Sequence, residues 1–139
     1  IITLEKNNIE AHSLLGAAFK GQGEEEQFNK EATLIKRLAP DSPLLCLNLA
    51  RVYLTLHDLD KAELTYKHGL QSSSDKTMLR MGLASLYLKQ MKPGLAYGQY
   101  QKVLKTSYLS EQHLINASFA LCQIALQNKV KKQQQSHKI

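Results

Sequence analysis

The sequence has few of the residues that cross-link small folds or break helices. It holds no tryptophan, three prolines and two cysteines in 139 residues. Two cysteines cannot build the multi-disulfide framework of a small secreted domain. No run of about 18 apolar residues occurs, so the sequence predicts no membrane-spanning helix. An apolar content of 43% favours a folded domain over a disordered chain.

Acidic residues are scarce in the second half of the chain. Residues 1–75 hold eight Lys or Arg and eleven Asp or Glu, a net charge of −3. Residues 76–139 hold ten Lys or Arg and one acid, Glu111, a net charge of +9. This asymmetry fits either a basic surface for an anionic partner or a solvated lysine-rich face. In that half we expect only Tyr97 and Tyr108 to offer exposed aromatic rings for base stacking, which argues against nucleic acid.

Catalytic and metal-binding patterns are also missing from the sequence. None of the five histidines lies one helical turn from another His or from a Cys, as a metal site would require. Neither Cys46 nor Cys122 has a nearby His that could activate a thiolate. His57 and Asp58 fit a turn, and the polar residues 72–75 fit a helix cap. We therefore expect no enzyme activity, no cofactor and no small-molecule substrate.

What the sequence does contain is a period of 34 residues. Seven positions of one stretch match a second stretch in residue type without an insertion: Leu49 and Leu83, Ala50 and Ala84, Tyr53 and Tyr87, Leu54 and Leu88, Ala62 and Ala96, Tyr66 and Tyr100, Leu70 and Leu104. A unit of this length cannot bury its own apolar face, so its copies must stack. Gly16, Ala50, Ala84 and Ser118 recur where stacked helices would cross closely.

The repeat resembles the tetratricopeptide repeat (TPR), whose pattern is Leu-Gly, Tyr, Ala, Phe and Pro over one unit. The residues that carry the resemblance are Leu15-Gly16, Phe19, Phe28, Ala32 and Pro40 in one unit and the seven matched pairs in the next two. The aromatic residue that precedes Leu-Gly in the TPR pattern is absent from every unit, and Pro40 is the only proline at the closing position. The resemblance implies an all-α fold, a right-handed α-solenoid of helix-turn-helix units with a C-terminal capping helix.

The register predicts a TPR domain over residues 1–128 and a basic, polar, frayed tail over residues 129–139. Residues 1–8 fit the end of a preceding unit, so we expect the chain to be a fragment of a longer protein. The complete units are 9–42, 43–76 and 77–110, and the capping helix is 111–128. Helices are expected at about 9–20, 24–38, 43–56, 59–71, 76–89, 92–106 and 111–129. Cys46 and Cys122 fall two units apart and should be free, which favours a reducing, cytoplasmic compartment.

In the TPR family the first helix of each unit lines a concave face. The resemblance therefore implies these partner-binding residues: Leu44, Leu47, Arg51, Leu54, Met78, Met81, Ser85, Leu88, Ile115 and Phe119. Four of them, Leu44, Leu47, Met78 and Met81, should form an apolar strip for a helix or an extended segment. At the capping helix, burial by neighbouring helices is an equal alternative. Of the positions that grip a carboxylate in chaperone-binding TPR proteins, only Asn48 fits.

Three functions remain open at this point. The first is a non-catalytic scaffold that binds a protein or peptide partner in its concave groove. The second is a non-catalytic TPR module of a larger enzyme or of a secretion or assembly machine. The third is a weak binder of anionic ligands or RNA through the basic C-terminal half.

Overall fold

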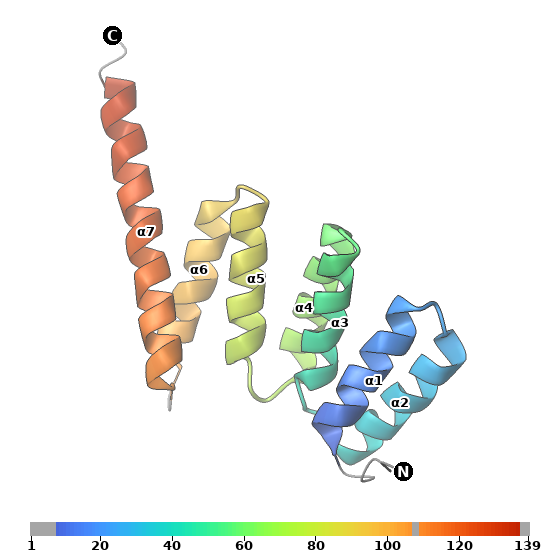
Figure 1. Cartoon of the computed structure of the whole chain (residues 1–139). Coiled ribbons are helices and arrows are strands. Elements are labelled where there is room, and N and C mark those ends of the chain that lie inside the picture. Colours follow the sequence, from blue (N-terminus) through green and yellow to red (C-terminus); the bar gives the residue numbers. More distant parts are fainter. Residues whose placement is uncertain (1–7, 107–108, 137–139) are drawn as a thin grey trace. The chain divides into compact units, whose positions relative to one another are not determined.

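The structure is a computed structural model that describes residues 8–106 and 109–136 (Figure 1). Within this part of the chain the regular elements are all helices, which confirms the all-α prediction. They are α1 (Ile9–Gly21), α2 (Glu25–Leu38), α3 (Leu44–Thr55), α4 (Leu59–Ser72), α5 (Thr77–Lys89), α6 (Pro93–Leu104) and α7 (Glu111–Ser136). The expectations for residues 1–7 and for Tyr108 lie outside the described residues.

The seventh helix is longer than the sequence pattern predicts. The pattern places its end near Lys129, followed by a frayed tail, but α7 continues to Ser136. Residues 129–136 contain neither Gly nor Pro and consist mainly of Lys and Gln, which are good helix formers. Nothing in this stretch therefore stops the helix, although its side chains are all exposed.

The chain forms two compact bodies, which we call the N-terminal body (residues 1–82) and the C-terminal body (residues 83–139). In the N-terminal body, α1 packs against both α2 and α3, and α3 packs against α4. In the C-terminal body, α6 packs against α7. The boundary falls inside α5, so this helix contributes residues to both bodies.

Small side chains are buried at three of the four expected helix crossings. Gly16, Ala50 and Ala84 are buried, and the two alanines are 0% exposed. The fourth residue, Ser118, is exposed instead, and its neighbour Ala117 is buried. This differs from the expectation because no described helix follows α7 to pack against that side of it.

The three turns inside the helical hairpins repeat the same geometry at the 34-residue period. Gly23, His57 and Met91 have positive φ angles of 79°, 59° and 61°. In each turn the following backbone N–H donates to the carbonyl five residues back, which belongs to Phe19, Tyr53 or Tyr87. This is the hydrogen bond of a Schellman motif, which satisfies the last carbonyls of a helix. The repeat therefore specifies the turns as well as the helices.

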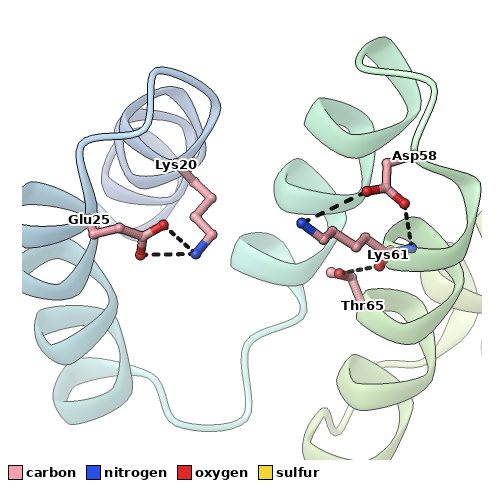
Figure 2. A network of polar contacts seen from close by, with 5 residues as sticks. All are labelled: Lys20, Glu25, Asp58, Lys61 and Thr65. Atoms are coloured by element: carbon pink, nitrogen blue, oxygen red, sulfur yellow. Dashed lines mark hydrogen bonds and ion pairs between the residues drawn. The ribbon is translucent and has the colours of Figure 1, made fainter.

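Polar contacts fix the start of the second helix in the first two hairpins (Figure 2). The Lys20 ammonium lies 2.7 Å and 2.9 Å from the two carboxylate oxygens of Glu25, so it joins the end of α1 to the start of α2. Asp58 caps α4, because its Oδ1 accepts a hydrogen bond of 3.1 Å from the Lys61 backbone N–H. Each contact lies at the turn that leads into the second helix of its hairpin.

Candidate protein-binding groove

An open groove of ≈ 400 Å³ runs between α1 and α3 in the N-terminal body. It exists because these two helices lie side by side as the first helices of consecutive units. Its lining comes from both helices: Leu14, Ala17, Ala18, Gly21, Asn48, Arg51, Val52, Thr55 and Leu56. Most of these side chains are apolar, and two of them, Leu14 and Leu56, are 52% and 58% exposed. The groove therefore presents apolar surface to solvent.

The polar groups of the groove cluster around Arg51. Its Nη1 lies 3.5 Å from the Oδ1 of buried Asn48, and its backbone carbonyl accepts a hydrogen bond from the Thr55 hydroxyl. No acidic residue lines the groove. The guanidinium also acts on Tyr66: burial raises the pKa of this phenol, and the positive charge of Arg51 partly opposes the rise. The groove thus combines an apolar wall with one cation.

Of the ten partner-binding residues predicted from the sequence, Arg51 is the one that lines this groove. In the N-terminal body, Leu44, Leu47, Leu54 and Met81 are half-buried, and Met78 is exposed. In the C-terminal body, Leu88 is half-buried, whereas Ser85, Ile115 and Phe119 are exposed. The predicted strip of Leu44, Leu47, Met78 and Met81 stays a prediction.

Leu14 and Leu56 were missed by the sequence reasoning. Leu14 lies 34 residues before Asn48, so both occupy the sixth position of their unit, and the ten predicted partner-binding residues do not include this position in any unit. The signal that could have revealed Leu14 is its apolar side chain at a position where the next repeat unit carries the polar Asn48. Leu56 follows the last residue of α3 and reaches the groove from the turn.

A second cavity of ≈ 360 Å³ lies between α2, α3 and α4 in the N-terminal body. The half-buried Cys46 lines it, and burial raises the pKa of the Cys46 thiol, which keeps the sulfur protonated and poorly nucleophilic. Cys46 and Cys122 are both free, as the sequence predicted, but Cys122 is exposed rather than packed. Among the described residues, no three His, Cys, Asp or Glu side chains gather as a metal site would require.

These features define an α-helical repeat protein made of stacked hairpins. No family model matches the sequence, and no curated protein shows significant similarity to it. Among solved structures, a thermophilic TPR protein of Thermus thermophilus is similar, with 30% sequence identity and a TM-score of 0.54. The match covers 74% of this chain and 53% of that one, so the chain spans about half of its length. The helical repeat fold of this chain is therefore consistent with the tetratricopeptide repeat.

The fold is accordingly that of a protein-interaction repeat module, and folds of this kind are typically non-catalytic scaffolds. A bilayer demands a helix that is both long and continuously apolar. None of the described helices meets both conditions, so none of them could span a membrane.

Proposed function

We propose that the chain is a non-catalytic scaffold whose N-terminal body binds a segment of a protein partner in the groove between α1 and α3. The observation that carries the proposal is the pairing of exposed Leu14 and Leu56 with Arg51 along one open groove. Exposed apolar surface rimmed by polar groups is typical of interaction sites. The predicted strip of Leu44, Leu47, Met78 and Met81 would extend the same binding surface.

The groove favours a partner segment of a particular chemistry. Apolar side chains spaced by one helical turn would contact Leu14, Val52 and Leu56, as an amphipathic helix in a groove does. An Asp or Glu of the segment would pair with Arg51, since the lining offers no competing acid. The same groove would serve equally if the chain were a module within a larger machine.

The test begins with a peptide-display selection against the full chain, followed by affinity measurements on the selected peptide. Leu14→Glu should weaken binding by more than about tenfold, because central apolar contacts carry most of an interface's affinity. Leu64→Glu is the matched control, since Leu64 is 65% exposed on α4 and does not line the groove. Equal affinities for the Leu14→Glu variant and the unmodified chain would contradict the proposal, as would an equal loss in both variants.

A further inference from the structure

The helix α7 carries an exposed apolar stripe that no described element covers. Its members are Ile115, Phe119, Cys122, Leu126 and Val130, and all five are exposed. Their spacing of three or four residues places them on one face of the helix. The buried residues of α7, Ala117 and Ile124, lie on the opposite face, and α6 packs against this helix. The stripe is therefore the free side of a helix whose other side is already covered.

The stripe has nearly the same pattern when it is read in either direction. From Ile115 the next member of the stripe is four positions on, at Phe119, and from Val130 the next member is four positions back, at Leu126. Cys122 lies next to the midpoint. An antiparallel copy of the same helix would thus set Ile115 against Val130 and Phe119 against Leu126. A surface that matches itself in this way suits a two-fold, isologous contact.

The charges along α7 favour the same antiparallel arrangement. Glu111 is the acidic residue of the first turn, whereas Lys129, Lys131 and Lys132 follow near the other end. Of these lysines, Lys129 flanks the stripe, whereas Lys131 lies on the opposite face with Ala117 and Ile124. In an antiparallel pair, Glu111 of one chain lies near Lys129 of the other, and the two helix dipoles oppose each other. A parallel pair would instead bring the lysines of both chains together. Charge complementarity therefore points to a second copy in the antiparallel orientation.

We propose that two copies of this chain associate through the exposed stripe of α7, antiparallel, with Cys122 of each chain beside the two-fold axis. The stripe is accessible for this contact, because its five side chains are exposed on the face of α7 opposite the buried Ala117 and Ile124. The stripe spans about 23 Å of helix at 1.5 Å per residue, which is short for a stable dimer. The association should therefore be weak and concentration-dependent.

Sedimentation of the full chain over a range of concentrations tests the interface. Phe119→Glu places a charge at the centre of the stripe and should weaken self-association by more than about tenfold. Leu114→Glu is the matched control, because Leu114 is also exposed on α7 but lies off the stripe. We expect this control to associate like the unmodified chain. A chain that stays monomeric at every concentration, or equal loss in both variants, overturns the proposal and leaves the stripe to another partner.

Cross-linking by diamide tests the position of Cys122 and the direction of the helices. In a Cys46→Ser background, the two Cys122 thiols should give up two hydrogens to diamide and join as a disulfide, since their Cα atoms would approach within about 7 Å. In chains without native cysteines, Ile115→Cys should cross-link with Val130→Cys and not with itself. Preferential self-cross-linking of Ile115→Cys would show a parallel pair and overturn the proposal. These readouts do not involve the α1–α3 groove, so they succeed or fail independently of the proposed function.

Discussion

Gly82 of α5 lacks a side chain at a point where the ring of Tyr66 occupies the space for one. A Cβ built on Gly82 would lie 2.5 Å from Cε1 of Tyr66 and 2.7 Å from its hydroxyl oxygen. Tyr66 is 5% exposed and cannot easily move aside. Both residues belong to the N-terminal body. A glycine that would otherwise weaken a helix is therefore required here by close packing.

Gly82→Ala should lower the free energy of unfolding by about 1–3 kcal/mol, because the added methyl group overpacks the contact with Tyr66. Gly98→Ala in α6 is the control, since a Cβ there would meet no atom within 4 Å. The control should raise stability by roughly 0.5–1 kcal/mol through the better helix propensity of alanine. Urea unfolding followed by circular dichroism measures both changes. A neutral Gly82→Ala variant would refute the tight contact.

The turn residue His57 should be replaceable by glycine with a gain in stability. His57 has a φ of 59°, and the same turn position in the first hairpin is occupied by Gly23. Relief of the left-handed backbone conformation should stabilise the fold by about 1 kcal/mol, partly offset by the greater freedom of glycine when unfolded. Thermal unfolding of His57→Gly measures the net gain. Gly23→Ala is the reciprocal variant and should lose stability. A loss of stability in His57→Gly together with a gain in Gly23→Ala would count against the shared turn geometry.

At the scale of the helices, the sequence predicted most of the structure because the signals are local and periodic. The 34-residue register located the first six helices to within two residues at each end. It did not predict the contact between His12 and Glu31, whose Nδ1 and Oε2 lie 2.7 Å apart between α1 and α2. His12 occupies the position where TPR units begin with an aromatic residue. Such a pair depends on how two helices face each other, and periodicity alone does not report that.

Ala50 of α3 provides the test of the helix-crossing interpretation. It is 0% exposed, and α3 packs against both α1 and α4. Ala50→Leu should therefore cost about 1–3 kcal/mol of stability, because the larger side chain forces neighbouring helices apart. Gln71→Leu adds the same side chain at an exposed site of α4 and should change stability little. If both variants melt at the temperature of the unmodified chain, Ala50 does not lie at a crowded crossing.

For the whole molecule, the sequence predicted the fold more readily than the residues that line the candidate groove. The repeat correctly predicted a TPR-like fold, which is typical of protein-interaction modules. The α1–α3 groove was harder to predict, because its shape depends on which side chains leave space between the two helices. Leu14 and Leu56 contribute to it only because small residues, Ala17, Ala18 and Gly21, line the rest of the α1 wall. Single positions in a repeat pattern do not reveal such a combination.

Each body contains a buried tyrosine that should make the stability of the chain fall at alkaline pH. Burial raises the pKa of Tyr66 in the N-terminal body and of Tyr100 in the C-terminal body above the ordinary value of about 10. Above this ordinary pKa the unfolded chain releases the phenolic protons while the folded chain still holds them. The unfolded state then binds fewer protons, so stability decreases as the pH rises through this window.

The contribution of these two phenols is fully present below about pH 9 and declines from about pH 10 towards their folded pKa values. Lys20 also contributes stability that declines at alkaline pH, because its hydrogen bond with Glu25 raises the pKa of its ammonium group. Lys20 is therefore kept in every variant compared. Urea unfolding at about pH 8 and about pH 10.5 should show a smaller alkaline loss for Tyr66→Phe and Tyr100→Phe than for the unmodified chain. Tyr97→Phe is the control, since Tyr97 is only half-buried on α6. If both Tyr66→Phe and Tyr100→Phe lose as much stability at alkaline pH as the unmodified chain does, the two phenols remain hydrated in the folded protein.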